Sequence, residues 1–152
     1  MYSNKLICQI INYINKNINQ KISIDDLEKR FFYNRFYIMK LFKKEIGVSI
    51  IDYINYIRIY NSFFELKNSN KKIINIAYNN GFYSLEYFSE LFKKIIGINP
   101  KKIEKYNTFY DEKVSKNISK IYNLKVKVNN YLSNQNTNNN SKMVLSIFKN
   151  KF

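Results

Sequence analysis

The sequence has no histidine, one cysteine and one proline among its 152 residues. Without histidine, the chain lacks the side chain that most often serves as a general base or a metal ligand. A single thiol, Cys8, excludes an internal disulfide framework and is typical of a reducing compartment. Cys8 lies in an apolar run, so we expect a buried structural thiol. We predict no enzyme, no metal and no cofactor.

Long apolar runs and acidic residues are also scarce. No run reaches 18 apolar residues and no signal-peptide pattern begins the chain, which favours a cytoplasmic protein without a membrane partner. Only 11 Asp and Glu residues balance 26 Lys and Arg residues, for a net charge of +15. Such an excess indicates a polyanionic partner. However, 23 lysines and 25 asparagines are a bias that an AT-rich genome also produces. The charge favours nucleic acid without identifying it.

A stretch of 15 residues occurs twice, 50 positions apart, as Tyr33–Gly47 and Tyr83–Gly97. Eight of the 15 aligned positions are identical. Each copy opens on a residue suited to a helix N-cap, Asn34 or Ser84, and ends on a glycine suited to the left-handed residue after a helix. The repeat therefore predicts two equivalent helices of about three turns each.

Apolar spacing within each copy predicts one core face and one outward face. The predicted core positions are Tyr37, Ile38, Leu41 and Phe42, and then Tyr87, Phe88, Leu91 and Phe92. The predicted outward positions are Arg35, Phe36, Met39, Lys40 and Lys43, and then Leu85, Glu86, Ser89, Glu90 and Lys93. Both outward faces end in lysines, which makes them candidate binding surfaces.

The whole pattern predicts an all-α fold of seven helices within residues 1–108. The expected helices are about 4–17, 24–30, 34–47, 49–67, 73–77, 84–97 and 101–106. A short helix, a tight turn and a second helix form a helix-turn-helix unit, and this pattern occurs at about 4–48 and again at 68–106. The helix at 49–67 is apolar on most of its circumference and is predicted to join the two units as a central helix.

Residues 109–152 are predicted to form a basic, Asn-rich, poorly structured C-terminal extension. Leu124, Val126 and Val128 alternate with lysines, which is a weak strand signal. Asn134–Ser141 is of low complexity and is predicted to be disordered. We expect a chain shortened to Asp111 to keep its melting transition and to lose only non-specific affinity.

Several short matches, in order and correctly spaced, are shared with a known family. They are Ile22–Leu27, Leu41–Gly47, Asp52–Ile54, Arg58–Ile59, Ile76–Ala77, Gly81–Phe82, Tyr87–Gly97 and Pro100. On these residues, 10–106 resemble the DNA-binding domain of AraC/XylS-type bacterial transcription regulators. The resemblance implies two helix-turn-helix units joined by a long central helix, and a short stand-alone member with no preceding domain.

The resemblance implies a sequence-specific regulator, an activator, that binds double-stranded DNA as a monomer in the bacterial cytoplasm and nucleoid. It implies base reading from positions matching Phe36, Met39 and Lys40, and then Glu86, Ser89 and Glu90. Arg35, Lys43, Lys44, Ser84, Leu85, Lys93 and Lys94 complete the candidate DNA-contacting set. Some bound members of the family also contact RNA polymerase.

Two residues depart from the family pattern: Glu28 stands where alanine is usual, and Glu90 where arginine is common. Carboxylates are repelled by DNA phosphates, so the second helix is expected to bind weakly. An alternative is that Glu28, Glu86 and Glu90 mark a protein-interaction module that no longer reads DNA. Phe36 and Met39 have a second interpretation too, as an apolar contact between helices.

Overall fold

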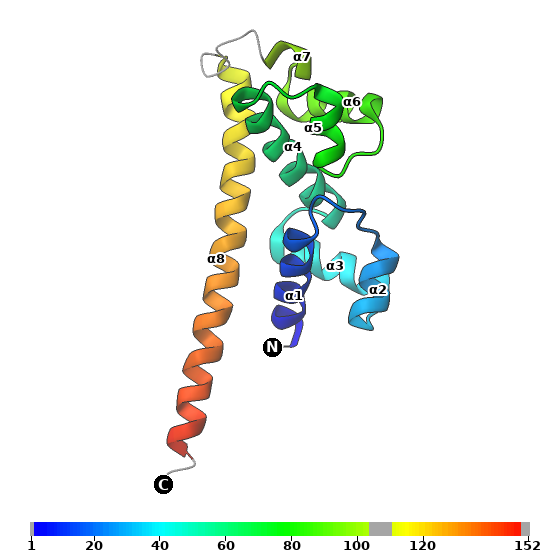
Figure 1. Ribbon diagram of the computed structural model, residues 1–152. Helices are drawn as coiled ribbons and strands as arrows, with labels where there is room; N and C mark the ends of the chain where they lie inside the picture. Colours follow the sequence, from blue (N-terminus) through cyan, green and yellow to red (C-terminus); the bar gives the residue numbers. More distant parts are fainter. Residues whose placement is uncertain (1, 104–110, 150–152) are drawn as a thin grey trace.

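The computed structural model describes residues 2–103 and 111–149, and all regular structure in these ranges is helical (Figure 1). The helices are α1 (Tyr2–Lys16), α2 (Ile24–Phe31), α3 (Arg35–Ile46), α4 (Ile50–Asn68), α5 (Ile73–Asn79), α6 (Leu85–Ile96), α7 (Pro100–Ile103) and α8 (Glu112–Lys149). The first seven confirm the predicted all-α arrangement, and α8 adds to it. No helix in the described ranges is long and apolar enough to cross a membrane.

The helix ends follow the caps that the sequence predicts. At the start of α4 the Ser49 hydroxyl accepts a hydrogen bond of 3.1 Å from the backbone N–H of Asp52. Gly47 and Gly97 end α3 and α6 with left-handed φ angles of 93° and 104°. Pro100 begins α7, and the rest of the predicted last helix, to Tyr106, lies outside the described residues.

Buried side chains form two cores, one in each lobe of the molecule. The first core joins α1, α2 and α3 to the N-terminal half of α4, around Phe42 and Tyr53. The second joins α5, α6 and α7 to the C-terminal half of α4, around Phe88 and Phe92. The 19 residues of α4 therefore serve both lobes as the central helix, which is about 28 Å long.

In place of the predicted poorly structured extension, the structure has α8, a helix of 38 residues that runs alongside both lobes (Figure 1). Val128 is buried in the first core, and Val114 and Ile121 are buried in the second. These three residues are seven apart, so they lie on one stripe of the helix. The expected strand at 124–128 and the expected disorder at Asn134–Ser141 are both replaced by helix. Burial of one stripe of α8 against the two lobes stabilises the helix more than the weak apolar alternation at 124–128 favours a strand.

Two contacts to α1 complete the first lobe. The Tyr53 hydroxyl on α4 donates to the Asn15 side chain at 2.7 Å, and burial raises the pKa of Tyr53 to about 12. The Tyr131 hydroxyl on α8 donates to Asn4 at 3.2 Å. Cys8, expected to be buried, is half-buried, and its partial burial raises the pKa of the thiol.

Candidate nucleic-acid interface

Side-chain caps begin both of the helices that flank the turn between α2 and α3. The Ser23 hydroxyl accepts from the backbone N–H of Asp26, and the Asp26 carboxylate accepts from the backbone N–H of Ser23, each at 3.1 Å. These bonds with Ser23 lower the pKa of Asp26. Phe32 follows α2 with a left-handed φ of 60°. Asn34 then caps α3 by accepting from the backbone N–H of Phe36 at 2.9 Å.

Glu28 closes the same turn from α2. Its carboxylate accepts from the backbone N–H of Arg35 at 3.1 Å and from the Arg35 guanidinium at 3.0 Å. The backbone hydrogen bond from Arg35 is the main reason that the pKa of Glu28 is lowered. Asp25 pairs with the same guanidinium. Glu28 thus holds α3 against α2, and two carboxylates already engage Arg35, a predicted DNA contact.

The outward face of α3 combines apolar and basic side chains. Phe36 is 72% exposed and Met39 is 39% exposed, and Lys40, Lys43 and Lys44 are also exposed. The structure therefore places five predicted contact residues of α3 in solvent. Neither Phe36 nor Met39 belongs to the two hydrophobic cores.

The outward face of α6 is more acidic. Of its predicted contact residues, Glu86, Glu90, Lys93 and Lys94 are exposed and Ser89 is half-buried. The Ser84 hydroxyl caps the helix by accepting from the backbone N–H of Tyr87 at 3.2 Å. Leu85 departs from the prediction, because it packs against the second core and does not face outward. The lysines of the last turn are balanced by carboxylates nearer the helix start.

Two tyrosines predicted to be core residues are exposed. Tyr37 is 46% exposed and Tyr87 is 50% exposed, at equivalent positions of α3 and α6. The prediction is wrong because these residues lie at the edge of the buried stripe, where the hydroxyl of a tyrosine can stay in water. Tyr33 stacks on Tyr37 with ring centroids 5.6 Å apart, and Tyr83 is 70% exposed. Four repeated tyrosines therefore flank the N-terminal turns of the two helices, which the sequence analysis missed.

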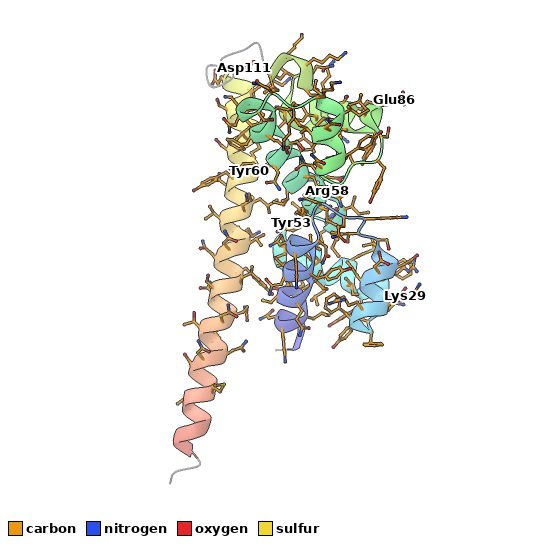
Figure 2. All side chains as sticks on the ribbon, viewed as in Figure 1. Lys29, Tyr53, Arg58, Tyr60, Glu86 and Asp111 are labelled. Carbon is orange, nitrogen blue, oxygen red and sulfur yellow. The ribbon has the colours of Figure 1, made fainter. Side chains whose placement is uncertain are left out.

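Arg58, on α4, also has a role that the sequence did not show. Its guanidinium donates to the backbone carbonyls of Ile18 at 2.8 Å and Gln20 at 2.6 Å, in the loop between α1 and α2. It also lies against the turn before α6, where a Cβ on Gly81 would come within 2.8 Å of Nε. Figure 2 shows Arg58 between the two lobes. Desolvation lowers the pKa of Arg58, and the residue links the first lobe to the turn of the second.

Both helix-turn-helix units point their turns in the same direction. In Figure 2, Lys29 from α2 and Glu86 from the start of α6 lie on the same side of the molecule, away from α8. The C-terminal ends of α3 and α6 contact α8 instead, through Ile46 and Ile96. The exposed N-terminal turns of the two equivalent helices are therefore directed away from α8.

Comparison with known proteins agrees with this geometry. Residues 27–106 match the sequence model of a family described as a helix-turn-helix domain. The chain belongs to the AraC/XylS-type family. It is thus a DNA-binding transcription regulator of the helix-turn-helix class.

The chain matches most of the length of some relatives and less than half of the length of others. The chain is 28% identical over 111 residues to the HTH-type transcriptional activator AarP of Providencia stuartii, covering 73% of this chain and 82% of AarP. It is 32% identical over 116 residues to the regulator YbfP of Bacillus subtilis, covering 76% of this chain but 38% of YbfP. The DNA-binding domain of AdpA, solved with a target DNA, shares the fold with a TM-score of 0.62 at 15% identity, covering 70% of this chain and 96% of that domain.

Proposed function

We propose that this regulator inserts α3 and α6 into successive major-groove segments on one face of a duplex. The observation that carries the proposal is that the two helices share caps and core positions and direct their exposed N-terminal turns away from α8. In helix-turn-helix proteins the second helix of each unit lies in the major groove and reads base edges. Contacts to phosphates set the position of the protein on the DNA.

The two helices contribute unequally. Lys40 on α3 is suited to the O6 and N7 acceptors of guanine, and Phe36 and Met39 are suited to a thymine methyl group. On α6 the base-facing Glu86 and Glu90 can accept only from a donor such as cytosine N4, and phosphates repel them. The α3 helix is therefore the main reading element, and Lys93 and Lys94 hold α6 close to the backbone.

The regulation that we propose is activation, in the bacterial cytoplasm at the nucleoid. It is supported by the likeness to AarP, which is described as a transcriptional activator. Because one chain carries both helix-turn-helix units, we propose that it binds as a monomer. Activation by a bound monomer would require a contact with RNA polymerase and no catalytic step, cofactor or metal.

Fluorescence anisotropy with a labelled random duplex at several salt concentrations tests the proposal. If Lys43, Lys44, Lys93 and Lys94 each neutralise a phosphate, log K falls with log salt at a slope of about −3.6. Selection from a random DNA pool is then expected to enrich two segments separated by about one helical turn, roughly 10 base pairs. Absence of duplex binding at low salt would overturn the proposal and favour a protein-interaction module, to which the exposed Glu86 and Glu90 are better suited.

A further inference from the structure

We call α3 and α6 the recognition helices, after the role proposed for them. Helix α8 donates one hydrogen bond to the last residue of each recognition helix. Lys127 Nζ donates to the backbone carbonyl of Ile46 at the end of α3, at 2.8 Å. Asn117 Nδ2 donates to the backbone carbonyl of Ile96 at the end of α6, also at 2.8 Å. Ile46 and Ile96 are equivalent positions of the repeat, 50 residues apart. One helix therefore satisfies the same C-terminal carbonyl, which lacks an intrahelical partner, in both copies.

The glycines that follow the two recognition helices allow this close approach. A Cβ on Gly47 would lie 2.9 Å from Lys127 Nζ, and a Cβ on Gly97 would lie 3.2 Å from the Lys113 side chain. Asn117 Nδ2 lies 3.4 Å from the same Gly97 position. The side chains of α8 thus lie directly on both helix ends, where the ammonium of Lys127 also meets the negative end of a helix dipole.

The part of α8 that carries these two donors is anchored in both cores. Val128 is 1% exposed in the first core, and Val114 and Ile121 are 1% and 4% exposed in the second. Lys125 adds a contact between α8 and α4, with its ammonium 4.4 Å from the centroid of the Tyr60 ring. Asn117 and Lys127 are ten residues apart on one helix, a fixed separation of about 15 Å.

We propose that α8 is a brace, in which Lys127 and Asn117 are positioning residues that fix the separation and orientation of α3 and α6. The α4 helix, together with Arg58 on it, forms one line of contact between the lobes. The brace adds a second line of contact beside α4 and so restricts rotation of one lobe against the other. Given the proposed function, on which this consequence rests, the protein accepts only operators with one spacing between their two segments.

Distances between spin labels test the brace without DNA. The labels are placed at the equivalent exposed positions by Phe36→Cys and Glu86→Cys, in a Cys8→Ser background. We expect one narrow distance distribution for this protein. The added pair Lys127→Met and Asn117→Leu, which removes both donors, is expected to widen it about twofold or more. The single variant Lys127→Arg, in which Asn117 is unchanged, keeps both donors. It is expected to give the same narrow distance distribution as the parent.

The matched control is Lys116→Met, which removes an equal charge from an exposed position of α8. It is expected to leave the distribution unchanged. Circular dichroism tests whether the double variant is folded. A folded double variant with the parent's distribution would overturn the brace. If the double variant does not fold, the single variants are compared, and an unchanged width in both overturns it equally.

Operator spacing supplies the readout that a merely stabilising contact would not change. One base pair is inserted between the two segments of the selected operator, which displaces one segment by about 3.4 Å. We expect the parent to lose about tenfold or more in affinity, comparable to a mismatch. The Lys127→Met, Asn117→Leu protein is expected to lose less than about threefold, and an equal loss in both proteins counts against the brace. If the parent binds no duplex, the proposed function fails, whereas the label distances still decide the brace.

Discussion

The two lobes have the same internal structure and different surfaces. Ile38, Phe42 and Ile46 are buried in the first, and Phe88, Phe92 and Ile96 are buried at the equivalent positions of the second. The outward positions proposed to read bases all differ, since Phe36, Met39 and Lys40 correspond to Glu86, Ser89 and Glu90, whereas the exposed lysines of the last turn are the same in both. Packing and capping constrain the first set, because a buried side chain has to fill its site. Solvent imposes no such constraint on the second set, which is free to acquire separate binding properties.

The turns before the recognition helices differ for a structural reason. In the second lobe the left-handed residue is Gly81, and Arg58 occupies the space where a Cβ would project. In the first lobe it is Phe32, which is 91% exposed. Only the second turn therefore needs glycine for close approach, and the first bears the cost of a non-glycine residue in this conformation.

Removing α8 is expected to have the largest effect, and it tests whether the two lobes depend on a shared element. A chain that stops after Asp111 loses three buried side chains, Val114, Ile121 and Val128. At about 1.5–3 kcal/mol each, this is roughly 5 kcal/mol or more, comparable to the whole stability of many domains. Circular dichroism at 222 nm should show a lower or lost melting transition. An unchanged transition would restore the expectation, drawn from the sequence, that the extension adds only charge.

Substitutions at the two turns are expected to have opposite signs. Gly81→Ala forces a Cβ into a left-handed residue and against Arg58, so it should destabilise the protein by about 2 kcal/mol or more. Phe32→Gly relieves the same backbone conformation without losing a buried contact, and should stabilise by up to about 1 kcal/mol. Urea unfolding of both variants measures the difference. If Phe32→Gly loses as much stability as Gly81→Ala, the proposed difference between the two turns, that only the second needs glycine, is contradicted.

DNA binding is expected to separate the two outward faces. Lys40→Ala should reduce discrimination between the selected operator and random duplex by about 1–3 kcal/mol. Lys43→Ala is the control from the same helix and should weaken both DNAs alike. Glu90→Arg should tighten random duplex and steepen the salt slope by about 0.9. Equal weakening of both DNAs by Lys40→Ala would contradict base reading by α3, and weaker operator binding by Glu90→Arg would show that α6 reads a cytosine.

The smallest effect concerns pH and the first turn alone. The folded state lowers the pKa of Glu28 below its ordinary value of 4.5, through the hydrogen bond from Arg35. The stability that this carboxylate provides is therefore present above pH 4.5 and is lost as the pH falls through the lowered pKa. In Glu28→Gln, the melting temperature should decrease less as the pH is lowered than it does in the parent. Some decrease should remain, because Asp26 also has a lowered pKa. Glu86→Gln, which removes an exposed charge from α6, should leave the fall unchanged.

The sequence by itself determined the helices of residues 2–103 and the equivalence of the two units. Caps such as Asn34 and Ser84, glycine helix ends and apolar periodicity act within a few residues, so they can be read along the chain. The same local rules misplaced Tyr37, Tyr87 and Leu85, which lie at the boundary between core and solvent. Their exposure depends on which neighbours cover each face.

Only the tertiary structure decided the roles of Arg35, Arg58 and α8. Arg35 pairs with Glu28 across a turn, and Arg58 joins loops that are distant in sequence. The seven-residue spacing of Val114, Ile121 and Val128 was present as a signal, but polar and asparagine-rich residues surround it. Most helix stability in proteins comes from burying one face, and the surfaces that bury α8 belong to both lobes. Those surfaces exist only after the two repeats have folded.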